Sequence, residues 1–360
     1  MSRRARSLPA AMGVLAAAGM LAAAGVRAVA EPPADTVDES ATSIPAWLDC
    51  AGCHAEIDAQ WRGSLHAAAW TDPIVQAEFA RSPGPSCRGC HAPASVAAPD
   101  DSAAAARGID CAACHLRDGW ILAARPSPAG VLAHPVRAAP AQITVDACRG
   151  CHQFNFADDG IHDPREPLQD TLAEWARSTA ADEGRTCQSC HMAEHRDADG
   201  VRRTSHALRG LDDPSLLAEA VRVEGEAIAD ASGVTVRFEL RGHRIGHAFP
   251  TGDLFREAVL TAHTDAGVRD TLVLKRWLAS TIDPDGEDHH IREVDDTRVP
   301  PPGTGIVRDE LRLEDPTATR VQWELRLHRL APGDARSRGL DAHASGLRVI
   351  RGEFPVRRRR

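Results

Sequence analysis

The stretch Cys148-Arg149-Gly150-Cys151-His152 has a spacing, Cys-x-x-Cys-His, that decides how this chain of 360 residues folds. The spacing occurs five times and uses all ten cysteines. The copies are Cys50-Ala-Gly-Cys53-His54, Cys87-Arg-Gly-Cys90-His91, Cys111-Ala-Ala-Cys114-His115, Cys148-Arg-Gly-Cys151-His152 and Cys187-Gln-Ser-Cys190-His191. Two thiols at this spacing reach the two vinyl groups of one haem, and the adjacent imidazole lies beneath the iron. The pattern predicts five covalently bound haems c, with the motif histidines as proximal iron ligands.

Two other uses of cysteine compete with this interpretation. A disulfide scaffold is common in small exported proteins, but framework cysteines have no reason to be followed by histidine in every second case. Zinc ribbons pair two Cys-x-x-Cys sites, need no histidine at that position, and cannot be built evenly from five half-sites. The repeated histidine therefore favours haem over both.

Histidines are also expected on the opposite side of the irons. Three of the four methionines lie at positions 1, 12 and 20, and Met192 adjoins His191 and cannot reach the other face of the same haem. Axial methionine raises the potential, so bis-histidine haems of low potential are expected. For each of the twelve remaining histidines the alternative is an ordinary surface or core residue. Context favours His66, His134, His206 and His247 as distal ligands, then His162, with His195 and His243 as substitutes for the fifth.

A faint internal repeat bears on these ligands. Trp61, Ser64 and His66 are echoed by Trp175, Ser178 and Ala180, where alanine replaces the expected ligand. We therefore expect one haem of the second half to take its ligand from elsewhere or to be five-coordinate and open.

The first thirty residues predict export. The pattern is typical of a signal peptide cleaved near Ala30. It consists of an arginine-rich start over residues 2–6, an apolar stretch over about 8–26 and small residues at 28–30. The alternative is an uncleaved membrane anchor; no later apolar run reaches the roughly 20 residues of a membrane span. Loss of four arginines and no acid changes the formal charge from −9 to −13. The mature protein is expected in the periplasm or otherwise exported, with basic faces on its redox partners and no affinity for nucleic acid.

The remaining organisation is expected to be multidomain α+β. After the signal peptide (1–30) and a linker (31–46), residues 47–212 form a mostly helical or irregular pentahaem domain, with helices near 55–70, 73–80 and 169–181. So few residues per haem leave the porphyrins as its core. Period-two patterns such as Val234 to Leu240 and Val321 to Leu327 predict an antiparallel β-sandwich over 213–350. The segment 351–360 is expected to be a basic tail. Asp285 to His290 could hold a cation, but the pattern favours a solvated turn.

The sequence resembles the bacterial multihaem cytochromes c related to the tetrahaem cytochrome that accepts electrons from hydroxylamine oxidoreductase. The resemblance rests on Trp61…Ser64…His66, on Cys187–Met192 followed by Ser205-His206, and on Gly246-His247-Ala-Phe-Pro-Thr-Gly252, and it covers about residues 47–252. It implies distal ligation by these histidines, haems stacked in close pairs, and periplasmic electron transfer. A fifth motif and an appended β-domain set this chain apart.

Two classes of function follow. The first is transfer of single electrons between a donor and an acceptor protein, without substrate chemistry. The second is a multihaem oxidoreductase that reduces or oxidises a small nitrogen or sulfur compound at one open haem. The sequence favours the carrier over the enzyme, because it has no Cys-x-x-Cys-Lys motif of the nitrite reductase kind and no tyrosine for the crosslink of hydroxylamine oxidoreductases.

The haem content gives the first testable prediction. Protein matured in a periplasm that attaches haem c should have the mass of residues 31–360 plus five haems, because every motif is complete. Intact-mass spectrometry measures this directly. A mass with fewer haems contradicts the pentahaem interpretation.

Overall fold

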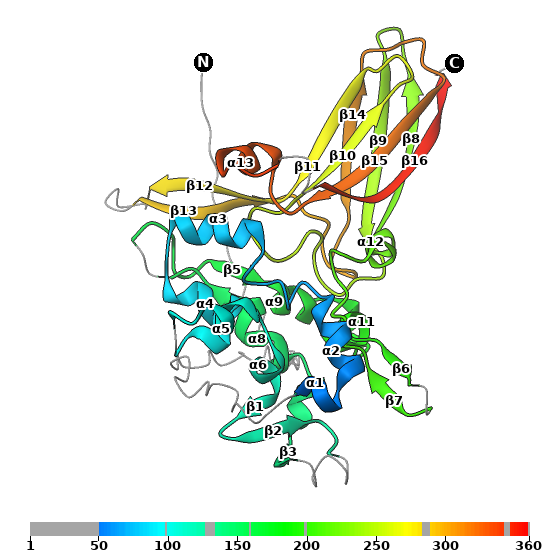
Figure 1. Cartoon of the computed structure of the whole chain (residues 1–360). Coiled ribbons are helices and arrows are strands. Elements are labelled where there is room, and N and C mark those ends of the chain that lie inside the picture. Colours follow the sequence, from blue (N-terminus) through cyan, green and yellow to red (C-terminus); the bar gives the residue numbers. More distant parts are fainter. Residues whose placement is uncertain are drawn as a thin grey trace, which may run out of the picture. The chain divides into compact units, whose positions relative to one another are not determined.

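The computed structural model describes residues 50–358 except 98, 127–133, 158–159, 198–199, 283–288 and 342–345 (Figure 1). By their contacts, residues 38–360 form one compact unit, to which all of these belong. The expected signal peptide and linker, the turn Asp285 to Asp288, His343 and the last two arginines lie outside the described residues. Within the described residues, every helix is too short or too polar to cross a membrane.

Each cysteine motif lies on its own short helix. These are α1 (Cys50–Cys53), α4 (Pro85–His91), α6 (Cys111–His115), α8 (Asp146–His152) and α11 (Cys187–His191). Capping fixes where two of them begin, since Asp110 accepts a hydrogen bond from the Ala113 amide and Thr186 forms a reciprocal cap with Ser189. The helical turn places the two cysteines and the histidine of a motif on one short segment.

Short helices and hairpins connect the motif helices. The helices are α2 (Ala55–Arg62), α3 (Pro73–Arg81), η1 (Pro93–Ser95), α5 (Ser102–Ala106), η2 (Pro140–Ile143), α9 (Thr171–Ala176) and α10 (Thr179–Asp182). The strands are β1 (Leu116–Arg117), β2 (Trp120–Ala123), β3 (Val136–Ala138), β4 (Gln153–Asn155), β5 (Pro167–Asp170), β6 (Glu194–Arg196) and β7 (Arg202–Thr204).

Of the three expected helices, one ends earlier than the sequence pattern indicates and another is divided in two. The helix expected over 55–70 stops at Arg62, because Gly63 ends it and the Ser64 hydroxyl accepts from the Ala67 amide in the following turns. The segment expected over 169–181 divides into α9 and α10, where the Ser178 hydroxyl donates to the Trp175 carbonyl. The helix expected over 73–80 is present as α3, begun by an Asp72 cap followed by proline.

The second half builds a large sheet of seven strands (Figure 1). Its strands are β8 (Val221–Ala229), β9 (Val234–Gly242), β10 (Glu257–His263), β11 (Arg269–Leu274), β14 (Val307–Leu313), β15 (Arg320–His328) and β16 (Gly346–Arg358), in the order β11-β10-β15-β16-β8-β9-β14. The Arg312 amide of β14 donates to Asp270 of β11, so the two outer strands approach each other and nearly close the sheet. The expected two-sheet antiparallel sandwich is not what these strands form, since β16 also pairs with β8 in parallel.

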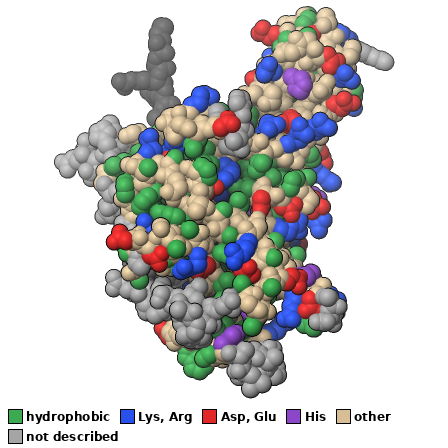
Figure 2. All heavy atoms as spheres, viewed as in Figure 1, with side chains coloured by type: hydrophobic (Ala, Val, Ile, Leu, Met, Phe, Trp, Pro, Cys, Tyr) green, Lys and Arg blue, Asp and Glu red, His purple; other side chains and the backbone are tan. Residues whose placement is uncertain are grey.

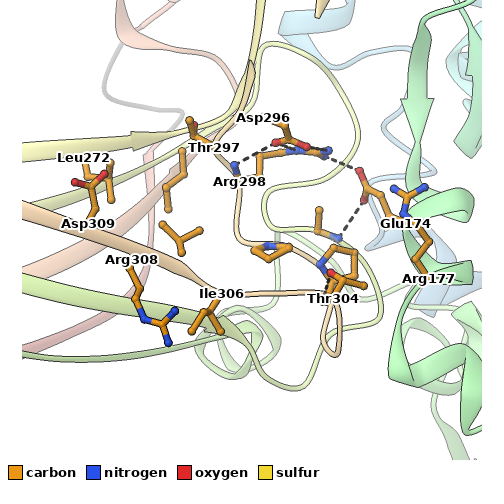
Figure 3. Close-up of a pocket in the computed structure, with 15 residues that line it drawn as sticks. Glu174, Arg177, Leu272, Asp296, Thr297, Arg298, Thr304, Ile306, Arg308 and Asp309 are labelled. Carbon is orange, nitrogen blue, oxygen red and sulfur yellow. Dashed lines mark hydrogen bonds and ion pairs between the residues drawn. The ribbon is translucent and has the colours of Figure 1, made fainter. Parts of the chain in front are cut away.

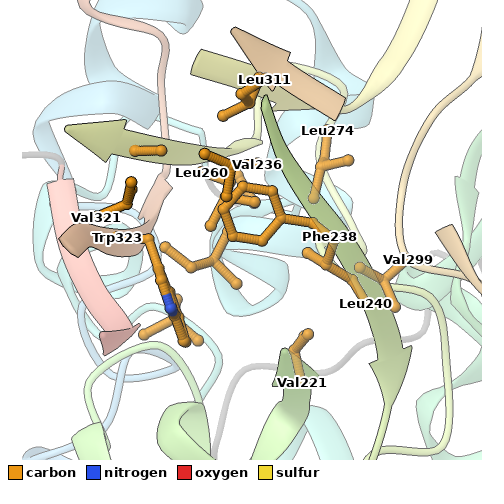
Figure 4. Packing of buried hydrophobic residues seen from close by; sticks show 14 of the residues in the cluster. Val221, Val236, Phe238, Leu240, Leu260, Leu274, Val299, Leu311, Val321 and Trp323 are labelled. Atoms are coloured by element: carbon orange, nitrogen blue, oxygen red, sulfur yellow. The ribbon is translucent and has the colours of Figure 1, made fainter. Parts of the chain in front are cut away.

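The core of this sheet follows the alternation read from the sequence. Val234, Val236, Phe238 and Leu240 on β9 are buried, and so are their counterparts Val321, Trp323, Leu325 and Leu327 on β15. Phe238 and Trp323 meet edge to face, with ring centroids 6.4 Å apart (Figure 4). The period-two prediction is therefore confirmed, because each strand has one face on this core.

The motif region has a different interior. Its buried apolar residues among the described ones are mostly alanines: Ala69, Ala92, Ala104, Ala105, Leu116, Phe156, Leu172 and Ala180. The hydrophobic cluster of the protein begins only at Leu217 and belongs to the sheet. Aliphatic side chains thus supply the core of the second half but only a small part of the interior of the first.

The two regions are joined by several segments. Helix α12 (Pro214–Ala220), capped by Asp213, leads into the sheet, and α13 (Pro332–Ser337) precedes its last strand. A hairpin of β12 (Arg276–Ile282) and β13 (His289–Asp296) extends toward the motif region, where Arg276 donates to the carbonyls of Pro167 and Leu168.

A buried ion pair provides the strongest of these links. Glu174 on α9 is 1% exposed, and its carboxylate lies 2.6 Å from the Arg298 guanidinium. The same carboxylate accepts from the Ala248 amide and the Thr251 hydroxyl. Helix α9 is therefore tied to the loop that contains His247.

Replacement of this glutamate tests the link. Glu174→Gln should lower the free energy of unfolding by about 1.5–3 kcal/mol, because Arg298 keeps only Asp296 and the Ala248 and Thr251 donors lose a charged acceptor. Glu219→Gln is the control, since its pair with Arg244 is exposed and worth less than about 1 kcal/mol. Urea denaturation measures both. Equal losses in the two variants would show that burial of Glu174 has no special effect.

Candidate functional site

Four pairs of histidine rings face one another, and each pair joins a motif histidine to one outside the motifs. The ring centroids are 6.5 Å apart for His54 and His134, 6.3 Å for His66 and His152, 6.1 Å for His115 and His206, and 6.3 Å for His191 and His247. An imidazole centroid lies ~1.1 Å from its Nε2 and a metal–nitrogen bond measures ~2.0–2.1 Å, so two rings that share a metal ion have centroids ~6.2 Å apart. All four pairs fit the space that one iron requires.

Backbone carbonyls orient several of these rings. The contacts from Nδ1 are His115 to Leu122 at 2.8 Å, His206 to Thr204 at 2.9 Å, His247 to Ala248 at 2.8 Å, His191 to Arg209 at 2.5 Å and His91 to Ala69 at 3.2 Å. An Nδ1–H that donates to a carbonyl fixes the tautomer and leaves the Nε2 lone pair available to a metal. These imidazoles are thus prepared as Nε2 ligands.

Burial keeps the central imidazoles neutral. It lowers the pKa of His152 to about 4, with the nearby His66 as the next cause, and it likewise lowers the pKa of His247 to about 4. The pKa values of His54, His66 and His206 are also lowered, chiefly by burial. A neutral imidazole is the form that binds a metal.

The internal repeat has the same structure in both copies. The Trp61 indole donates to the Ile109 carbonyl and the Trp175 indole donates to the Arg185 carbonyl, each at 2.8 Å. Ser64 and Ser178, three residues after each tryptophan, are both buried. The two segments therefore provide equivalent positions for residue 66 and residue 180.

The missing ligand at Ala180 is replaced from another segment. A Cβ on Gly246 would lie 3.2 Å from the Ala180 Cβ and 3.4 Å from Trp175 Cδ1, so the loop packs directly on the repeat. The next residue of that loop, His247, faces His191. Of the two outcomes expected for the second half, a ligand taken from elsewhere is the one that this geometry matches.

Glu174 positions that loop, and it was not found from the sequence (Figure 3). Its carboxylate accepts from Ala248 and Thr251, two residues of the loop that follow His247. Its ion pair with Arg298 continues to Asp296, which forms a chain of three charged side chains. The available signal was an acidic residue beside Trp175 on the apolar face of a predicted helix, where a charge is expected only with a partner.

A cavity of about 530 Å³ lies beside this chain of charges (Figure 3). Arg177 and Arg308, which line it, are paired with Asp170 and Glu239, and Arg298 is paired as described above. The cavity therefore presents compensated charges and no motif histidine among its lining residues.

His162 and His91 are not brought together. The His162 ring stacks on Phe156 with centroids 4.3 Å apart and planes 4° from parallel, and its backbone bridges to Ile291. In the part of the chain that the structure describes, no second histidine ring faces His91 as in the four pairs. The substitutes are placed elsewhere as well, since His195 contacts Glu56 and His243 is exposed.

The ten cysteines are all described, and several are grouped across motifs. The Cys50 and Cys111 thiols are neighbours, as are those of Cys90 and Cys151 and those of Cys148 and Cys187. Burial, with the charge of Cys50 next, raises the pKa of Cys111 to about 12. The described residues contain no cluster of three or more histidines, cysteines or acids that could hold a metal ion by itself. The donor sets fit covalent haem, with one histidine on each side of the iron, better than a zinc cage.

Residues 49–116 match the family of cytochrome c554 and c-prime. The matched stretch contains the first three motifs and the Trp61 to His66 segment. The fold is similar to that of a penta-heme cytochrome c552 from Thermochromatium tepidum, with a TM-score of 0.64 and 23% sequence identity over 85% of this chain and 97% of that chain. No curated protein matches the sequence.

The His247 pair gives a prediction for the assembled protein. His247→Ala should convert one low-spin haem to high spin, because the ring opposite His191 is removed. His243→Ala is the matched control, since this exposed neighbour faces no motif histidine. Electron paramagnetic resonance of the oxidised variants measures the spin states. An unchanged spectrum for His247→Ala would show that the loop does not ligate iron.

Proposed function

We propose that this protein is an exported pentahaem cytochrome c that transfers single electrons between redox partners. The observation that carries the proposal is the set of four histidine pairs with iron-sized spacing, each built on a Cys-x-x-Cys-His helix. The match of residues 49–116 to a cytochrome family and the likeness to a penta-heme structure support it.

The chain's own residues define the ligand set of the proposal. The ten motif cysteines would form the thioether bonds, and the five motif histidines would be proximal ligands. Distal ligands would be His134 for the haem of His54, His66 for His152, His206 for His115 and His247 for His191. When bound, the haems supply one-electron Fe(III)/Fe(II) chemistry. The protein holds the imidazoles neutral and oriented by the carbonyls described above.

Proximity of the motifs supports a connected carrier. Thiol neighbours link the first motif to the third, the second to the fourth, and the fourth to the fifth. The charge of Cys151 in the fourth motif also acts on Cys114 in the third, which joins the two groups. The small, alanine-rich set of buried side chains in this region is consistent with haems as its core. Electron transfer is thus favoured over five isolated structural cofactors.

The second candidate function concerns the haem of His91. Because no described histidine faces this ring, this is the site at which an open iron could meet a small nitrogen or sulfur compound. If His162 were the distal ligand of this haem, the iron would be closed; if not, it would be open to a substrate. The experiment below distinguishes the electron carrier from the oxidoreductase.

Export and partners are further parts of the proposal. The features of residues 1–30 support a signal peptide cleaved near Ala30 and a periplasmic location. On the face shown in Figure 2, acidic and basic side chains are interspersed. The net charge of the mature chain nevertheless favours partners with basic docking faces, whose association weakens with salt. Residues 47–212 would form the haem domain and residues 213–350 the β-domain that provides His247.

Spin state and reactivity test the function together. The carrier should show low-spin signals from the four paired haems, and the fully reduced protein should be reoxidised by nitrite, hydroxylamine or sulfite no faster than by buffer. Electron paramagnetic resonance and anaerobic stopped-flow absorbance measure the two properties. Rapid reoxidation by one of these compounds, with a spectral shift of a high-spin haem, would overturn the carrier in favour of the oxidoreductase.

A further inference from the structure

Arg256 is held at the end of the loop that contains His247. Its Nη1 donates to the Thr251 carbonyl at 2.8 Å, and its backbone amide donates to the Asp253 carbonyl. Gly252, at a φ of +92°, lies under the guanidinium, and a Cβ there would come within 2.5 Å of Nη1. The loop is therefore shaped to hold this guanidinium in one place.

The guanidinium is desolvated without a carboxylate partner. Burial lowers the pKa of Arg256, although its surface is only half-buried, as expected for a side chain that lines an interior space. Within the described residues no carboxylate lies in ion-pair distance of it. The nearest negative charges are those of Asp253 and then Asp72. The Asp253 carboxylate accepts from the Phe255 amide, and Asp72 is paired with Arg329 at 2.7 Å and also caps α3.

Comparable arginines do have such partners. Arg276, Arg298 and Arg338 are each less than a tenth exposed, and each contacts a glutamate: Glu293, Glu174 and Glu78. A desolvated cation without a counter-charge is costly, because solvation is lost and nothing replaces it. Arg256 differs from these three arginines, because it has no carboxylate within ion-pair distance among the described residues.

Hydrogen bonds lead from Arg256 to the fourth motif. The Thr251 carbonyl accepts from Arg256, and the Thr251 hydroxyl lies 2.9 Å from that of Thr171 at the start of α9. The Ala173 amide of the same helix donates to Gln153, the residue after His152. The facing rings of His152 and His66 enclose the iron-sized space of this motif. An anion beside Arg256 would therefore lie close to the haem attached at Cys148 and Cys151.

We propose that Arg256 binds a propionate carboxylate of the haem attached at Cys148 and Cys151. This inference rests on the proposed haem content. A guanidinium matches a carboxylate in a bidentate geometry, and the contact would give each group the counter-charge it lacks. The loop from Gly246 to Arg256 would then serve two haems, by ligation of one iron through His247 and by charge compensation of the next through Arg256.

The sign of the effect follows from electrostatics. Arginine neutralises an anion beside the iron, and without it the uncompensated propionate favours the more positive Fe(III) state. Arg256→Gln should therefore lower the midpoint potential of the haem ligated by His152. We expect about a tenfold shift in its ratio of oxidised to reduced forms at a fixed applied potential, which corresponds to about 59 mV for a one-electron couple.

The experiment compares four variants of the mature protein with the wild type. Spectroelectrochemical titration of Arg256→Gln should show one haem shifted to lower potential, and Arg256→Lys, which keeps the charge, should show a smaller shift. Arg244→Gln is the control, because it removes an exposed, paired arginine and should leave all potentials unchanged. His66→Ala, which should turn the fourth haem high-spin, identifies the affected haem by electron paramagnetic resonance.

Intact mass distinguishes the possible outcomes. Loss of one haem from Arg256→Gln, with all five retained in Arg244→Gln, also supports the contact, since the propionate would then be needed for haem attachment. Five haems with unchanged potentials in Arg256→Gln overturn it, and so does an equal shift in Arg244→Gln. A wild type with fewer than five haems, or with no low-spin haem at the fourth motif, would instead count against the proposed function.

Discussion

The structure depends on histidine rings that meet across the chain at the spacing of a shared iron. Each pair joins a short motif helix to a segment far away in the sequence, so each acts as a long-range crosslink once a metal is bound. Few apolar side chains are buried in this half of the chain, so crosslinks of this kind would supply much of the stabilisation that an aliphatic core gives the sheet.

The loop from Gly246 to Arg256 connects the motif region with the sheet. It packs on Ala180 and Trp175 at one end, is fixed by Glu174 in the middle, and holds the Arg256 guanidinium at the other end. Since Arg298 of the sheet region completes the buried charge pair, the position of His247 depends on both halves of the protein. The β-domain is thus structurally joined to the motif region at the His191–His247 pair.

The second copy of the internal repeat leaves room for the loop that contains His247. Both copies keep the tryptophan indole on a backbone carbonyl and a buried serine three residues later. At the next equivalent position one copy has His66 and the other has a small alanine, which leaves room for Gly246 to approach. An inserted histidine from the loop thus replaces one that the repeat lacks, at the cost of a tightly packed contact.

The sequence by itself determined the five motifs, the alternating strands and the presence of a second region without cysteine. These follow from local patterns, because each motif occupies five neighbouring residues and period two places one face of a strand on a core. Only the tertiary structure decided which histidines face each other, and that His162 stacks on Phe156 instead. It also decided that the strands form one nearly closed sheet with a parallel pair, and that Glu174 bonds to the loop after His247 while Arg256 donates to the same loop. Those outcomes depend on contacts between distant segments and on the desolvation of charges, and neither can be read from the neighbours of a residue in the chain.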